Sequence, residues 1–252
     1  MKRTIKILTM VLIILLVGCT NPINNMIDET KSKINKEIGK VENVGKDKIK
    51  EHVTYILEHY NSKVDKDYVY NVMILKELSK NSYFEDNNIK LLCDRAYNYM
   101  LIKSKTNKND LETIVEIVKK DIDKEVDEFY NLYKQRVVIN SFFAKAKTKL
   151  LSESKSKDYI NKNKVKEAIK YIKSNYKNSY KNNEIMEHIC YYSYYLDNIN
   201  TKYSVKNNIT ELGTKTKKYL LNNDKEVLKD IESIINNIDE EKEIDEILNS
   251  IK

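Results

Sequence analysis

Residues 109–138 read NDLETIVEIVKKDIDKEVDEFYNLYKQRVV, and this stretch decides the fold class. Its apolar side chains recur at intervals of three and four, at Ile114, Val118, Ile122, Val126, Phe129, Tyr133 and Val137. That interval is the repeat of one face of an α-helix, so the stretch predicts one long helix or a broken pair of helices. Asn109 followed by Glu112 has the form of a capping box, and we expect the helix to begin there.

The chain beyond residue 48 follows the same period. It contains one glycine, Gly213, and no proline, which leaves few positions for the tight turns that a β-sheet requires. Residues 223–226 read NDKE and predict a second capped helix start, and a phase shift in the apolar residues that follow predicts a break near Asp239. We therefore expect an all-α fold of seven to nine helices, packed as one bundle in a single domain of residues 49–252.

The beginning of the chain has the features of an export signal. Two basic residues precede an apolar run at 5–17 that is too short to span a bilayer comfortably. Residues 16–19 read LVGC, which resembles the lipobox of bacterial lipoproteins. The resemblance implies that residues 1–18 are removed as a signal peptide, and that Cys19 carries diacylglycerol on its sulfur and an acyl group on its amine. Two or three acyl chains give a stable membrane anchor, which one chain alone does not.

The segment that follows, residues 19–48, is polar and holds Pro22, Gly39 and Gly45. No aromatic residue occurs before Tyr55, so this segment has little with which to build a core. We expect a flexible tether that holds the folded domain away from the lipid. A second possibility is that part of it is helical, because its apolar residues have near-heptad spacing, at Ile27, Ile34, Ile38 and Val41.

The charge of the chain argues against one class of partner. The formal net charge is +7 for the whole chain and +4 for residues 19–252, because residues 1–18 contain three basic residues and no acidic one. This mild excess is far below the charge density of a dedicated nucleic-acid binder. We expect no nucleic-acid partner.

A second stretch raises the question of a contact surface. Residues 188–203 read HICYYSYYLDNINTKY and contain five tyrosines. On a helix, Tyr192 falls on the apolar face that must meet the core, whereas Tyr191, Tyr194 and Tyr195 lie off that face. In one interpretation the helix is central, and its neighbours bury the extra rings. In the other, the rings stand in solvent as a recognition patch, since tyrosine is a favoured anchor at protein interfaces.

The sequence holds no recognisable pattern of catalytic or metal-binding residues. His52 and His59 are two of only three histidines, and they lie about 10 Å apart along one predicted helix, too far to share a metal ion. No glycine-rich phosphate loop, G-x-S-x-G elbow or HExxH motif occurs. We expect no enzyme activity, no cofactor, no metal and no small-molecule substrate. We also expect each histidine to lie at the surface or at the boundary of the core.

Two thiols are left once Cys19 is lipidated. Cys93 falls on an apolar helical stripe and should be a small buried side chain, whereas Cys190 lies off the stripe of its own helix. We expect two buried free thiols. A disulfide between Cys93 and Cys190 is the alternative, because exported proteins form such bonds.

The last residue offers one further contact. Lys252 carries a side-chain ammonium and the terminal carboxylate together, which is the pair of charges that the lysine-binding sites of plasminogen kringle domains accept. We name it as a candidate contact for plasminogen.

The overall layout resembles the outer-surface lipoproteins of Borrelia-type spirochaetes. The lipobox at residues 16–19, the polar segment after it, and a helical domain rich in lysine, asparagine, isoleucine and tyrosine carry the resemblance. The families there include complement-regulator-acquiring proteins, decorin- and fibronectin-binding lipoproteins and variable surface antigens. The resemblance implies anchoring in the outer membrane at the cell surface, and binding of a host serum or matrix protein. No residues that define binding in those families can be matched to this chain.

Three hypotheses follow. The first is a lipid-anchored surface protein that binds a host complement regulator or plasminogen for adhesion or immune evasion. Its candidate contact residues are Tyr191, Tyr194, Tyr195 and Lys252. The second is a structural or periplasm-facing lipoprotein that pairs with another bacterial protein. The third is a glycan-binding adhesin that uses a group of lysines, namely Lys215, Lys217 and Lys218.

Overall fold

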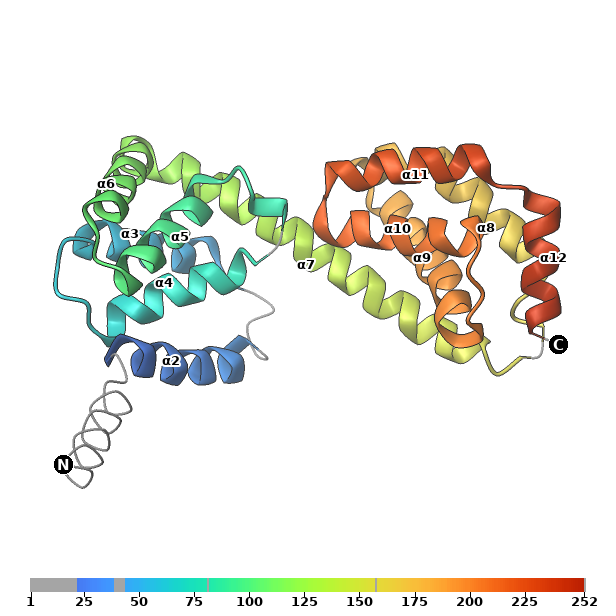
Figure 1. Cartoon of the computed structure of the whole chain (residues 1–252), viewed down its shortest axis with the longest axis horizontal. Coiled ribbons are helices and arrows are strands. Elements are labelled where there is room, and N and C mark those ends of the chain that lie inside the picture. Colours follow the sequence, from blue (N-terminus) through green and yellow to red (C-terminus); the bar gives the residue numbers. More distant parts are fainter. Residues whose placement is uncertain (1–21, 39–43, 81, 157, 252) are drawn as a thin grey trace, which may run out of the picture. The chain divides into compact units, whose positions relative to one another are not determined.

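The computed structural model describes residues 22–38, 44–80, 82–156 and 158–251. These residues form eleven α-helices and two short 3-10 helices, and they contain no strand (Figure 1). The expected all-α fold class is confirmed, whereas the helices outnumber the seven to nine expected. None of the described helices is long and apolar enough to cross a membrane. Three expected features lie outside the described residues: the signal peptide of residues 1–18, the lipidated Cys19, and Lys252.

The chain divides into two compact units rather than one domain. The first comprises the described parts of Met1–Lys80 together with Phe84–Asn131, and the second comprises those of Asn81–Tyr83 and Leu132–Lys252. The boundary falls inside α7 (Ile122–Glu153), which begins in the first unit and ends in the second. The prediction of a single bundle over residues 49–252 is therefore wrong, because helical periodicity does not reveal which helices share a core.

Six helices contribute to the first unit. They are α2 (Pro22–Ile38), α3 (Lys46–His59), α4 (Lys66–Leu78), α5 (Asn88–Leu101), α6 (Lys105–Lys120) and the beginning of α7. Figure 1 shows α2 running alongside α4, and α2 also contacts α5. Phe84 and Phe129 pack together in the core of this unit, with ring centroids 4.9 Å apart.

Helix α2 lies where the sequence suggested a flexible tether. Ile27 and Ile34 are one heptad apart and are each only 3% exposed. Lys66 of α4 binds Glu29 of α2 with an N–O distance of 2.9 Å. The heptad spacing places both isoleucines on one face, and burial of that face holds the helix to its unit. The tether prediction is wrong for residues 22–38, and the helical alternative is what the structure shows.

Residues 109–138 belong to a broken pair of helices. Helix α6 ends at Lys120, Asp121 is not helical, and α7 begins at Ile122. The expected helix start at Asn109 is wrong, because α6 begins earlier and its N-cap is Ser104. The Ser104 hydroxyl accepts a hydrogen bond from the backbone N–H of Asn107 at 3.0 Å. A first turn of polar residues carries no apolar period, so the sequence pattern missed it.

The second unit contains the end of α7 and five further helices. These are α8 (Lys162–Asn175), α9 (Asn183–Tyr203), α10 (Asn208–Asn222), α11 (Lys225–Asn237) and α12 (Glu240–Ser250). Asp224 caps α11 and Asp239 caps α12, each by accepting a hydrogen bond from the backbone of its first turn. Both predicted boundaries are confirmed. Helix α9 packs against α8 and against α10, and α11 packs on α10 (Figure 1).

A glycine sets the distance between α9 and α10. A methyl group added at Gly213 would lie 2.5 Å from the Cβ of Leu196 and 2.7 Å from the backbone nitrogen of Asp197. Both distances are far below van der Waals contact, and the second atom belongs to the backbone of α9. The two helices therefore approach so closely only because position 213 has no side chain.

Replacing this glycine tests the close approach. We expect Gly213→Ala to lower the free energy of unfolding by about 3 kcal/mol, because the backbone of α9 cannot move aside without separating the helices. Urea unfolding followed by circular dichroism measures the change. Gly45→Ala is the matched control, since nothing lies within 4 Å of its added methyl group. We expect it to change stability by no more than about 1 kcal/mol. Equal losses in the two variants would contradict the packing argument.

His52 lies in the core of the first unit, and this corrects the expectation of a surface or boundary histidine. Its side chain is 5% exposed, and its Nδ1 is 2.7 Å from Oδ1 of Asn71. Burial lowers the pKa of His52 below its usual value, because desolvation disfavours the charged ring. The folded protein therefore holds this ring neutral at a pH where the unfolded chain begins to protonate it.

This burial predicts a pH dependence of stability. As the pH falls below about 6.5, the unfolded chain takes up a proton at His52 that the folded protein does not, so the free energy of unfolding decreases. We expect His52→Gln to reduce that decrease when urea unfolding is measured at intervals between about pH 7 and 5. His59→Gln on the same helix is the control. An unchanged pH dependence in the His52 variant would show that His52 does not contribute to it.

Candidate functional site

The tyrosines of α9 are mostly core residues. Tyr191 and Tyr195 are 8% and 0% exposed. The Tyr195 hydroxyl donates to the backbone oxygen of Tyr159 at 3.4 Å. Because α8 and α10 pack on α9, side chains outside its main apolar face are also enclosed. The prediction of a solvent-exposed recognition patch is therefore wrong for Tyr191 and Tyr195. The interpretation of α9 as a central helix accounts for the burial of both rings.

Tyr194 differs from its neighbours. Its side chain is half-buried, and Nζ of Lys217 lies 5.1 Å from the centre of its ring. Lys217 also binds Asp197 at 2.6 Å. Tyr194 is thus the one member of the expected patch that still faces partly outward.

Tyr191 has a second role in addition to packing, because it lines a hollow between α7 and α9. We call this hollow the α7–α9 groove, and its volume is about 470 Å³, within the range of small-ligand sites. Its lining comprises Phe142, Lys145, Ala146 and Lys149 of α7 and Glu187, His188, Tyr191 and Tyr192 of α9. Each set has helical spacing, so one face of each helix forms one wall.

The floor of the groove is aromatic and largely buried. Phe142, Ala146, Tyr191 and Tyr192 are each at most 9% exposed. The rings of Tyr191 and Tyr192 meet edge to face, with centroids 5.3 Å apart. Tyr171 of α8 packs against Tyr192 at 5.2 Å and against the ring of His188 at 5.6 Å. Such contacts fix the orientation of each ring.

Carboxylates hold the two tyrosine hydroxyls of the floor. Tyr191 donates to Glu153 at 2.5 Å, and Tyr192 donates to Glu167 at 2.6 Å. Burial, together with these acceptors, raises the pKa of both phenols, so both stay neutral and remain donors. Burial alone would raise the pKa of Glu153, but hydrogen bonds from Lys164 and Tyr191 outweigh it and lower that pKa. Glu153 is therefore a charged acceptor at neutral pH.

Two lysines form the rim. Lys145 lies 5.3 Å above the ring of Phe142, and Lys149 lies 4.3 Å above the ring of Tyr191, both measured from Nζ to the ring centre. Their ion pairs are long, with 3.6 Å from Lys145 to Glu187 and 4.0 Å from Lys149 to Glu153. Exposed pairs of this kind contribute little stability. Both ammonium groups are therefore available to an anion that enters the groove.

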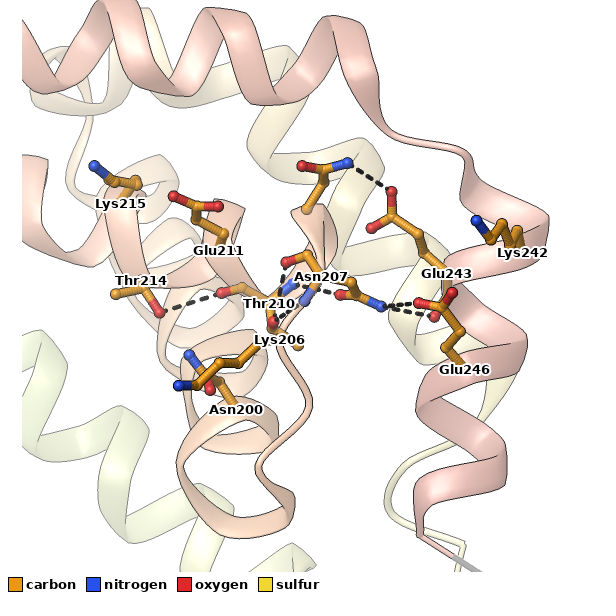
Figure 2. A pocket seen from close by; sticks show the side chains of 11 residues that line it. Asn200, Lys206, Asn207, Thr210, Glu211, Thr214, Lys215, Lys242, Glu243 and Glu246 are labelled. Atoms are coloured by element: carbon orange, nitrogen blue, oxygen red, sulfur yellow. Dashed lines mark hydrogen bonds between the residues drawn. The ribbon is translucent and has the colours of Figure 1, made fainter.

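A second hollow lies at the first turn of α10. This polar pocket has a volume of about 550 Å³. Its buried carboxylate, Glu243 of α12, accepts hydrogen bonds from the side chain of Asn208 and the backbone N–H groups of Ile209 and Asp239. Asn207 donates to the backbone of Glu243, as Figure 2 shows. These bonds tie α12 to the start of α10.

The rest of the polar pocket lacks an equally organised set of groups. Lys215 binds Asp230 at 2.7 Å, and Lys206 and Lys242 are exposed to solvent. Thr214 donates to the carboxylate of Asp197 at 2.8 Å. Hydrogen bonds join Asn207, Asn208, Thr210 and Glu243, so this pocket is best explained as part of the fold (Figure 2).

Several sequence predictions are settled by the positions of the side chains. Lys215 binds Asp230 at 2.7 Å and Lys217 binds Asp197 at 2.6 Å, so two of the three lysines of the proposed glycan contact are already paired. Lys218 lies 4.0 Å from Asp224. Cys93 and Cys190 are buried free thiols, which confirms that expectation and rules out the disulfide. Burial raises the pKa of both thiols, which keeps them protonated and unreactive. In the part of the chain that the structure describes, no group of three potential ligand side chains is placed to hold a metal ion.

The sequence pattern does not reveal most of the groove. It assigns Tyr192 to the core alone and does not single out Phe142, Lys145 or Lys149. One signal was present, because residues 129–152 contain five basic side chains and no acidic one. That run shows a basic helix, but it does not show which other helix faces it.

Comparison of the chain with protein-family models, with curated proteins and with solved structures gives no match.

The bond between Tyr191 and Glu153 provides a test of the floor. We expect Tyr191→Phe to lower the free energy of unfolding by about 1–3 kcal/mol, because a hydrogen bond to a charged group is lost while the ring is kept. Thermal and urea unfolding measure the change. Tyr194→Phe, which removes the hydroxyl of a half-buried ring on the same helix, should change stability by less than about 0.5 kcal/mol. If both variants match the parent protein, the hydroxyl of Tyr191 does not hold the floor together.

Proposed function

We propose that this chain is a lipid-anchored bacterial surface protein that binds a host macromolecule through the α7–α9 groove. The observation that carries the proposal is the aromatic floor of the groove beneath a rim of two lysines. The lipobox-like residues 16–19 support the anchor, with Cys19 as the lipidated residue. The resemblance to spirochaete surface lipoproteins supports a host serum protein, either a complement regulator or plasminogen, as the first candidate.

The chemistry of the groove suits binding better than catalysis. The hydroxyls of Tyr191 and Tyr192 are committed to carboxylates, and Nδ1 of His188 lies 2.8 Å from the backbone oxygen of Glu184. These bonds hold the rings in place, and rings held in place form good anchor sites for a partner. The lysines above them add attraction at long range, which speeds association with an acidic partner.

Charge reversal at the rim tests this proposal. We would immobilise the chain from residue 19, with Cys19→Ser, and incubate it with human serum. We expect it to retain a serum protein, and we expect Lys149→Glu to reduce the retained amount about tenfold, because the rim then repels an acidic partner. Lys147→Glu is the matched control, since Lys147 is exposed on the same helix and does not line the groove.

Two outcomes would contradict the proposal. If the immobilised protein retains no serum protein, the proposal of host binding is contradicted and a bacterial partner is favoured. Equal losses in the Lys147 and Lys149 variants would place the contact outside the groove. Loss of plasminogen on deletion of Lys252 alone would assign that contact to the end of the chain.

The anchor and the location need separate measurements. A clickable palmitate analogue supplied to cells should label the parent protein, and Cys19→Ser should abolish the label. Protease treatment of intact cells should remove the protein if it faces outward. Survival of the protein under that treatment would favour the periplasm-facing alternative.

A further inference from the structure

We infer that the α7–α9 groove binds an acidic segment of a partner protein that inserts an aromatic side chain between the two helices. This inference rests on the proposed function, and it names the chemistry that the groove selects. Three features of the groove carry it: the composition of the floor, the charge of the rim, and the scarcity of apolar surface around it.

The floor is suited to a ring. Phe142 approaches from α7 and Tyr191 and Tyr192 approach from α9, so rings line both walls of the groove. Aromatic pairs are favourable at centroid separations of 4.5–7 Å in edge-to-face or offset geometry. The volume of about 470 Å³ leaves room for one aromatic side chain and for part of the chain that carries it. Because the rings of the floor are already packed, binding requires little further ordering.

The rim is suited to carboxylates. Glu153 already accepts strong hydrogen bonds from Lys164 and Tyr191, each 2.5 Å long, so Lys149 at 4.0 Å is not needed to neutralise it. Glu187 is the single acidic residue of the lining, which also contains the two lysines Lys145 and Lys149. The lining therefore keeps a net positive charge. An acidic segment would gain attraction at this rim, and a basic one would be repelled.

Two other kinds of ligand match the groove less well than an acidic aromatic segment. An anionic lipid headgroup would satisfy the lysines but has no ring for the floor. A second copy of the chain would need a broad apolar surface around the groove. Among the described residues of the second unit, Leu151 is the only large apolar side chain recorded as exposed. A dimer interface requires far more apolar contact than one leucine provides.

Synthetic peptides test the inference directly. The probes are three twelve-residue peptides with the same spacing: an acidic one with a central phenylalanine, the same peptide with a central alanine, and a basic one with the phenylalanine. Isothermal titration of the chain from residue 19, with Cys19→Ser, measures each affinity at two salt concentrations. We expect the acidic aromatic peptide to bind about tenfold more tightly than either other peptide, with an affinity that falls as salt rises.

Variants separate the two parts of the groove. Lys149→Glu should weaken binding of the acidic aromatic peptide about tenfold. Lys147→Glu should change the affinity for that peptide by less than about threefold. Phe142→Leu keeps an apolar side chain of similar size. Phe142→Leu should weaken binding of the same peptide severalfold and leave the salt dependence of its affinity unchanged. Circular dichroism and unfolding curves establish that each variant is folded.

Each outcome either supports or overturns the inference. Equal affinity for the phenylalanine and alanine peptides would overturn it, because charge alone would then explain binding. Equal effects of Lys147→Glu and Lys149→Glu, or no binding of any peptide, would also overturn it. Binding to phosphatidylglycerol vesicles that depends on Lys149, with no peptide binding, would assign the groove to lipid. The serum experiment is independent of these results, so host binding through this groove can stand if the peptides fail.

Discussion

The close approach of α9 and α10 at Gly213 is the constraint on which the second unit depends. The missing side chain lets α10 reach the backbone of α9 near Leu196 and Asp197. Helix α8 packs against α9 as well, so α9 has neighbours on more than one side. Tyr191 lies off the main apolar face of α9 and is buried against Lys149 and Glu153 of α7 and Lys164 of α8. The aromatic floor of the groove follows from that burial, since Tyr191 would otherwise stand in solvent.

Burial of a tyrosine brings a polar atom into the core, and the groove makes use of that atom. The hydroxyls of Tyr191 and Tyr192 reach carboxylates of α7 and α8, which satisfies the phenols and links three helices. Above this floor, Lys145 lies over the ring of Phe142 and Lys149 lies over the ring of Tyr191. A surface of fixed rings beneath lysines is suited to capture an anionic partner, because the rings need little further ordering on binding.

The beginning of the chain changes how the proposed anchor would act. Helix α2 begins at Pro22 and packs in the first unit, so it is not a spacer. If Cys19 carries lipid, only Thr20 and Asn21 separate it from Pro22, and the three Cα–Cα steps from Cys19 to Pro22 span at most about 11 Å. The first unit would then lie close to the membrane.

The sequence by itself left open whether residues 109–138 form one helix or a broken pair. It determined the all-α fold class, a helix start within residues 223–226, a break near Asp239, and the burial of Cys93. These features depend on helical period and on hydrogen bonds within one turn, which are local. The tertiary structure alone decided the division into two units, the packing of α2, and the burial of Tyr191 beside a groove. The reason is physical: each of these depends on which helix faces meet. Phe142 and Tyr191 are far apart in the sequence, and only the packed helices bring them together.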